Sequence, residues 1–160
     1  MEFLKLLIPF LIIFSSYGED FLSSLPLTYK DCNIKKNHII LSKNDLAIMK
    51  SHLSQSISSG IFKKYDLSCG KTKYDGYILS DKIRTHYQTI LFLLDNNKIQ
   101  DLVLLDFTEP VQYRAPSKWL EKFKHIDFKK NYTIDALSGA TLTRQSTIKL
   151  LKQAFYLEKI

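Results

Sequence analysis

Two long apolar runs lie one after the other in the middle of the chain. Residues 86–94 read HYQTILFLL and residues 99–107 read IQDLVLLDF, and both are rich in residues that favour strands. The segment between them contains Asn96 and Asn97, and asparagine tolerates the positive φ of a tight turn. The pattern therefore predicts a β-hairpin. Because polar residues hardly alternate with apolar ones, we expect both faces of this sheet to be covered, one of them by a helix.

Helical spacing first appears in the N-terminal half of the chain. Ser42 and Asp45 are placed as the N-cap and third residue of a helix. Gly60 then predicts that this helix ends at Ser58 or Ser59. The apolar stripe predicted to pack on the core is Leu46, Met49, Leu53 and Ile57.

Two further helices are expected in the C-terminal half. Pro110 and Pro116 bracket a loop over residues 109–116, and a short helix capped by Ser117 should follow over 117–123. The last helix should begin at Leu142 or Thr143 and run to about residue 156. Its predicted inward stripe is Ile148, Leu151 and Phe155.

The remaining segments carry weaker patterns. Residues 19–41 are predicted to be irregular, residues 61–67 a short strand, and residues 68–76 a polar loop punctuated by glycine. A further strand should begin within residues 77–79. Together these elements predict an α+β fold, with a twisted, mainly antiparallel sheet packed by helices.

The first residues form an apolar segment of a different kind. The run from Leu6 to Phe14 is nine residues long, whereas a membrane-spanning helix needs roughly 20. Ser16 and Gly18 are the small residues expected before a cleavage site. We expect residues 1–18 to be a signal peptide and the protein to be periplasmic or exported. An uncleaved segment that associates the protein with the membrane, and a buried hydrophobic segment, remain open.

The charge and the cysteine content indicate which partners and which cellular compartment suit the protein. The 160 residues, 45% of them hydrophobic, suit one domain, and the formal net charge is +7. In an exported protein this charge suits an anionic membrane, an acidic redox partner or a phosphate-bearing cofactor, and we expect no nucleic-acid partner. A merely solvated basic surface remains open. Cys32 and Cys69 suggest a disulfide outside the cytosol, with two reduced thiols as the alternative.

The segment with the densest chemical signal reads DALSGATLT, from Asp135 to Thr143. Gly139 permits close approach of the backbone. The predicted helix that follows would aim its first amides and the positive end of its dipole at this turn, where phosphate is a natural occupant. Three hydroxyls, from Ser138, Thr141 and Thr143, could donate to it. The other interpretation is a turn that only caps a helix.

This segment resembles the flavinylation motif of FMN-binding domain proteins. That family includes the C subunit of sodium-translocating NADH:quinone reductase and the G subunit of the Rnf electron-transport complex. The resemblance implies that a flavin transferase uses FAD to attach FMN, through a phosphoester, to Thr141. It implies that Asp135 is the acidic residue the transferase requires. The remaining recognition and phosphate-binding residues would be Ser138, Gly139, Ala140, Leu142 and Thr143.

The resemblance extends more weakly upstream. Residues 76–82 and the following hairpin resemble the central sheet of the family, and residues 107–113 followed by Trp119 resemble its next loop. The resemblance covers residues 75–156, which we expect to form the FMN-binding core. Residues 19–74 are expected to be an N-terminal lead-in and helix of the same domain. The chain has Glu109-Pro110 where larger members carry Thr-Pro-Gly, so ring contacts are not carried over.

Several side chains are candidates for contact with the flavin. Tyr113 and Trp119 have aromatic faces suited to stacking, and Glu109 could hydrogen-bond the ring edge. Ordinary packing or a solvated charge is the alternative for each. Three cationic candidates for the phosphate or ring are Lys82, Arg84 and His86, although His86 also suits a structural position.

The expected function is electron transfer by covalent FMN between a membrane or periplasmic donor and an acceptor. A phosphoester would prevent loss of the cofactor outside the cell, while the surroundings tune its potential. Two alternatives are a small exported flavin-dependent reductase and a non-redox exported binding module. No residue indicates a substrate-binding site, and we therefore favour the electron carrier over the reductase.

Overall fold

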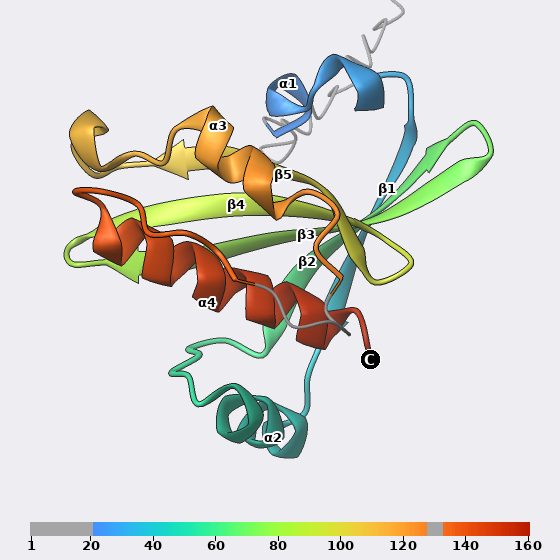
Figure 1. The fold of residues 1–160 in the computed structure, drawn as a ribbon. Helices are drawn as coiled ribbons and strands as arrows, with labels where there is room; N and C mark the ends of the chain where they lie inside the picture. The colour runs from blue at the N-terminus through green and yellow to red at the C-terminus, as the bar shows by residue number, and fades with distance from the viewer. Residues whose placement is uncertain (1–20, 128–132) are drawn as a thin grey trace, which may run out of the picture.

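The computed structural model describes residues 21–127 and 133–160, so the predicted signal peptide lies outside the described residues. Its centre is a five-stranded antiparallel sheet in which each strand pairs with the next along the chain (Figure 1). This confirms the α+β class and the antiparallel sheet. The strands are β1 (Asn33–Ile40), β2 (Ile61–Cys69), β3 (Thr72–Ile83), β4 (His86–Asp95) and β5 (Lys98–Phe107).

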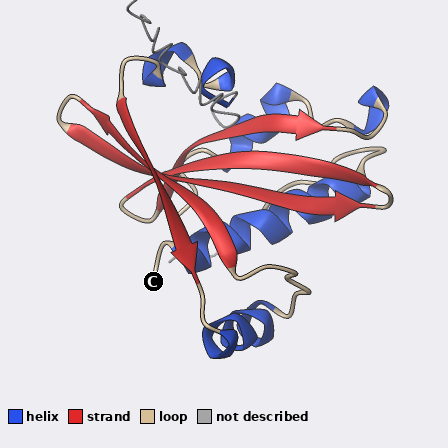
Figure 2. Cartoon of the chain, turned by 180° about the vertical axis from the view of Figure 1, so that it is seen from behind, coloured by secondary structure: helices blue, strands red, loops and turns tan. Residues whose placement is uncertain are grey.

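Helices and short 3-10 turns lie around this sheet. The long helix α4 crosses one face: it stands in front of the strands in Figure 1 and behind them in Figure 2. The helical elements are α1 (Phe21–Ser24), η1 (Leu27–Tyr29), α2 (Lys43–Leu53), η2 (Val111–Tyr113), α3 (Ser117–Leu120), η3 (Glu121–Phe123) and α4 (Thr141–Leu157).

The two faces of the central strands belong to different apolar clusters. On the α4 face, Ile90 and Phe92 pack with Leu150 and Leu151 of the helix, and all four are fully buried. On the opposite face, Leu91 and Leu93 alternate with them and pack with the segment that contains α1 and η1. The prediction that both faces of the hairpin are covered is therefore confirmed for its central residues, whereas Tyr87 at the start of β4 is exposed. The predicted turn, in which Asn96 and Asn97 have positive φ, is also confirmed.

The N-terminal region is more regular than predicted. Residues 33–40, expected to be irregular, form strand β1, and residues 68–76, expected to be a loop, contain a tight turn at Gly70 and the start of β3. Of the two glycines that suggested a loop, Gly76 has a different role. Gly76 lies inside β3, where a Cβ would stand 3.3 Å from the Tyr65 backbone oxygen, so glycine permits close packing of two strands.

Helix α2 is shorter than predicted. Its N-cap is confirmed, because the Ser42 hydroxyl accepts from the Asp45 amide at 3.1 Å. The helix ends at Leu53, where Ser54 adopts the left-handed conformation, and not before Gly60. Ile57 still reaches the core, but from an irregular segment after the helix, so its place in the helical stripe was wrong.

Two other helix starts also differ. Pro116 occupies the N-cap of α3, so Ser117 is the first helical residue and not the cap. Helix α4 begins at Thr141, one residue before the earlier of the two predicted starts, Leu142 and Thr143. Within its predicted inward stripe, Leu151 and Phe155 are buried, whereas Ile148 is only partly buried.

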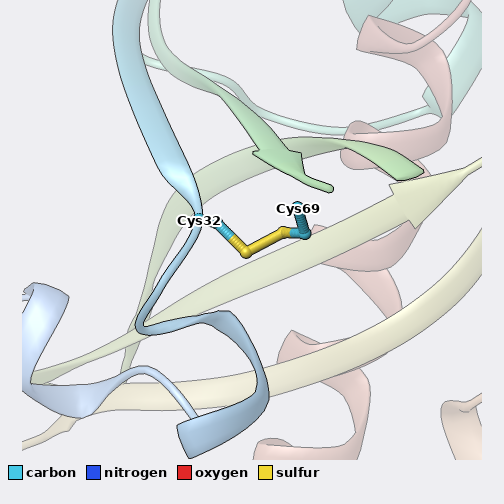
Figure 3. Close-up of a disulfide and its surroundings, with 2 residues drawn as sticks. All are labelled: Cys32 and Cys69. Carbon is cyan, nitrogen blue, oxygen red and sulfur yellow. A yellow bond between two sulfur atoms is a disulfide. The ribbon is translucent and has the colours of Figure 1, made fainter. Parts of the chain in front are cut away.

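A disulfide joins the beginning of the sheet to the β2–β3 turn. Cys32 lies just before β1 and bonds to Cys69 at the end of β2 (Figure 3), which confirms the pairing that the sequence suggested. The two cysteines are 37 residues apart. The bond therefore shortens a long loop of the unfolded chain.

Replacing both cysteines, as Cys32→Ser with Cys69→Ser, should lower the free energy of unfolding by about 3–4 kcal/mol, the loss of chain entropy expected for a loop of this length. Urea unfolding of the oxidised protein and the double variant measures the difference. Equal midpoints and slopes in the two proteins would contradict a stabilising role for the bond.

The C-terminal end of α4 is tied to the sheet by a buried phenol. Tyr77, only 1% exposed, donates to the Glu158 carboxylate at 2.7 Å. Burial raises the pKa of Glu158, although the hydrogen bond from Tyr77 and the nearby Lys64 act in the opposite direction. The folded protein thus holds the Glu158 proton more tightly than the unfolded chain does. Deprotonation of Glu158 therefore opposes folding as the pH rises through its folded pKa.

We expect Glu158→Gln to gain stability relative to the parent protein as the pH is raised from about 4, near the unfolded pKa of glutamate, to about 7. The reason is that only the parent deprotonates a partly buried group over this range. Urea unfolding at several pH values measures the difference. The surface variant Glu121→Gln serves as control, and a Glu158→Gln difference that stays constant with pH would disprove the coupling.

Candidate functional site

One end of the sheet gathers three segments that are distant in sequence. The β3–β4 turn, the η2 loop that follows β5, and the start of α4 meet there (Figure 1). They enclose a pocket of about 140 Å³. The pocket is lined by Ile83, Arg84, Glu109, Tyr113, Gly139, Ala140, Thr141, Leu142 and Thr143.

The start of α4 has backbone amide donors that no side chain caps. Gly139 has a φ of +72°, a conformation that L side chains rarely adopt. Ala140 occupies the N-cap and offers no side-chain acceptor to the first-turn amides. Thr141 is the first helical residue and is exposed. Its hydroxyl therefore stands at the positive end of a 17-residue helix, beside amides that have no partner in a preceding turn.

Hydrogen bonds hold this helix start in place. The Thr143 hydroxyl, which is buried, donates to the Tyr113 carbonyl at 2.8 Å and so joins α4 to η2. Arg144 donates from its side chain to the carbonyls of Ile134 and Asp135, at 2.7 and 3.1 Å. The turn before α4 is thus fixed from both sides.

The pocket contains an acid whose hydrogen bonding is incomplete. Glu109 is only 8% exposed, and its Oε1 atom has no hydrogen-bond partner among the described residues. A buried polar atom without a partner is costly. A ligand that brings an N–H donor into the pocket would satisfy it.

A cation and an aromatic ring also line the pocket. The Arg84 guanidinium lies 5.2 Å from the centroid of the Tyr113 ring, a cation–π contact. Arg84 itself has a φ of +53°, a left-handed conformation that is typical of tight hairpin turns such as the one between β3 and β4. The pocket therefore offers positive charge beside a flat aromatic surface.

Asp135 stands apart from the pocket. Its exposed carboxylate forms an ion pair with Lys122 at 2.6 Å. The hydrogen bond from Lys122 and its charge lower the pKa of Asp135. The acid is therefore presented to solvent as a carboxylate, where a second protein can reach it.

The structure brings most of the predicted site residues together, but not all of them. Glu109, Tyr113 and residues 139–143 share the pocket. Trp119 does not: it is 5% exposed, packs edge-on against Phe123, and donates to the Asp135 carbonyl. Ser138 is exposed but does not line the pocket.

The predicted polar groups also differ in their availability. The Thr143 hydroxyl is engaged by Tyr113, so among the three predicted hydroxyls those of Ser138 and Thr141 remain at the surface. Among the three candidate cations, Arg84 lines the pocket, and Lys82 and His86 do not. The sequence analysis missed Ile83, whose only signal was its position just before the β3–β4 turn.

No protein family, curated protein or solved structure matches this chain. Within residues 21–127 and 133–160, no helix is both long and apolar enough to cross a membrane. The same part of the chain holds no group of three or more His, Cys, Asp and Glu side chains placed to bind a metal ion.

Proposed function

We propose that this protein is an exported electron carrier of the FMN-binding domain type, with FMN joined through its phosphate to Thr141. The observation that carries the proposal is the position of the Thr141 hydroxyl. Thr141 is an exposed residue that lines a pocket, begins a long helix, and lies within the motif that resembles the family's attachment site.

The residues around Thr141 fit the chemistry of a flavin nucleotide. Free first-turn amides and the helix dipole favour the phosphate, and the Arg84 guanidinium adds positive charge. The partnerless Glu109 oxygen suits the imide N–H of a flavin ring. Tyr113 offers an aromatic face, although its ring already contacts Arg84. When bound, FMN would supply the capacity to accept and donate electrons.

The size of the pocket favours a carrier over a reductase. Pockets that enclose small molecules usually measure roughly 300–1,000 Å³, whereas this one measures about 140 Å³. It has room for the phosphate or one edge of the ring, not for a flavin together with a substrate. A flavin attached here would stay open to other proteins, as exchange of electrons with a membrane or periplasmic donor and acceptor requires.

Thr141→Ala should abolish attachment, because the variant lacks the hydroxyl that would form the phosphoester. The protein is produced with its export signal in a host that has an active flavin transferase, and its intact mass and colour are measured. We expect a yellow parent protein carrying an FMN-sized increment, and a colourless variant without it. Thr141→Ser, which keeps a hydroxyl, is the matched control for the fold of the helix start.

The alternatives give other results. A parent protein without the increment would favour the non-redox binding module. Rapid turnover of a soluble oxidant by the flavinylated protein alone would favour the reductase. Either outcome would remove the electron-carrier proposal.

Asp135→Ala should lower the flavinylated fraction while leaving the urea midpoint unchanged, because we propose that this exposed carboxylate is read by the transferase. Lys122→Ala is the matched control, since it breaks the same ion pair but keeps the carboxylate. Mass spectrometry gives the fraction modified. Equal modification of the parent and both variants would show that Asp135 has no such role.

A further inference from the structure

The sheet face opposite α4 is only partly covered. The N-terminal segment packs its Leu25 and Tyr29 on one end of that face, near the disulfide, over Tyr65 and Leu67. Among residues 21–127 and 133–160, no helix lies over the rest of this face (Figure 2). We propose that this uncovered part is a docking surface for an anionic lipid membrane.

The surface follows from strand register. Side chains alternate between the faces of a sheet, and the pairs His38↔Lys63, Lys63↔Ile78 and Ile78↔Leu91 place these residues on the face opposite α4. Counting in steps of two along each strand assigns further residues to this face. They are Ile40, Ile61, Lys82 and Tyr87 toward its open end, and Lys36 on the edge strand β1, where it pairs with Tyr65. We define the open sheet surface by six exposed residues, Lys36, Ile40, Ile61, Lys63, Lys82 and Tyr87.

Its apolar part is a pair of neighbouring isoleucines. Ile40 and Ile61 are direct cross-strand partners at the ends of β1 and β2, and they are 74% and 60% exposed. Tyr87, at the start of β4, is 52% exposed. Aliphatic side chains exposed side by side on a strand pair gain from burial in an apolar phase.

Its charged part is an excess of free lysines. Lys36, Lys63 and Lys82 form no ion pair with any residue of the described ranges. Two carboxylates of β5 lie on the same face. Asp101 forms an ion pair with Lys124, and Asp106, the cross-strand partner of Thr89, is exposed. The open sheet surface is therefore positive overall.

The residue types favour lipid over a protein partner. Protein interfaces are enriched in tyrosine, tryptophan and arginine, and lysine is depleted there. Lysines instead suit a membrane surface, because their stems lie along the apolar boundary while the ammonium reaches anionic headgroups. Exposed isoleucines can enter the acyl boundary beside them, and tyrosine favours the same level.

Docking through this surface would also bring the Thr141 pocket toward the membrane. Lys82 and Tyr87 are cross-strand partners that flank the β3–β4 turn, and Arg84 of that turn lines the pocket. The inference deepens the proposed function by making the lipid bilayer the place where electrons are exchanged. Lipid binding itself requires no flavin, so the two proposals fail separately.

The test is sedimentation of the full exported protein with vesicles of phosphatidylcholine alone or mixed with phosphatidylglycerol. We expect binding to the anionic vesicles, release by salt, and little binding to the neutral ones. The variant Lys36→Glu with Lys63→Glu and Lys82→Glu should lose at least about tenfold in affinity for anionic vesicles. Ile40→Ser with Ile61→Ser should bind more weakly than the parent but keep its dependence on salt.

The matched control reverses three lysines outside the open sheet surface, as Lys35→Glu with Lys43→Glu and Lys152→Glu. It changes the net charge equally and should keep most of the binding, as should Thr141→Ala. Equal loss in the control would show that only net charge matters. Equal binding to neutral vesicles would assign the interaction to another apolar segment. Absence of binding to anionic vesicles would leave the surface to an acidic protein, and each of these results would overturn the proposal.

Discussion

The packing of α4 across β3 and β4 is the constraint on which the rest of the structure depends. Ile90, Phe92 and Leu94 point from β4 to the same face, and Leu150 and Leu151 of α4 meet them there without exposure to solvent. Truncating one such side chain to alanine typically costs about 2–5 kcal/mol. Because this contact fixes the axis of the helix, it also determines where the first residue of the helix stands.

Polar contacts then refine the position that packing sets. The Gln88 amide donates to the Thr147 hydroxyl at 3.0 Å and to that of Ser146 at 3.3 Å, which ties the first strand residues of β4 to the middle of α4. The Thr143–Tyr113 hydrogen bond joins the same helix to the loop after β5. These bonds hold α4 against β4 and against the η2 loop, so a group attached at Thr141 meets surroundings that are already formed.

Local patterns in the sequence predicted the elements whose signals are local. The β4–β5 hairpin was predicted because two apolar runs flank a turn of asparagines, and α4 because its apolar stripe is long. Strand β1 was missed because Lys35 and Lys36 interrupt its alternation, and a partner strand 21 residues further on completes it: Ile40 pairs with Ile61. Helix α2 ends early because Ser54 takes the left-handed conformation, for which the sequence offered no strong signal.

The candidate site likewise has a part that local sequence predicted and a part that depends on tertiary contacts. The segment from Gly139 to Thr143 was predicted from nine consecutive residues, and the structure places it at a pocket. The choice of Arg84 over Lys82 and His86 depends on tertiary structure, since all three lie close together in sequence around the β3–β4 turn. Burial of Trp119 away from the pocket likewise follows from α3 packing on the sheet, a contact that spacing along the chain does not encode.

The central claim is that one hydroxyl at this helix start carries a flavin nucleotide. Fragmentation mass spectrometry of the peptide spanning residues 134–144, taken from exported protein made beside an active flavin transferase, tests it most directly. The account predicts a flavin mononucleotide phosphoryl group on Thr141. An unmodified peptide, or a flavin placed on Ser138 or Thr143, would contradict it.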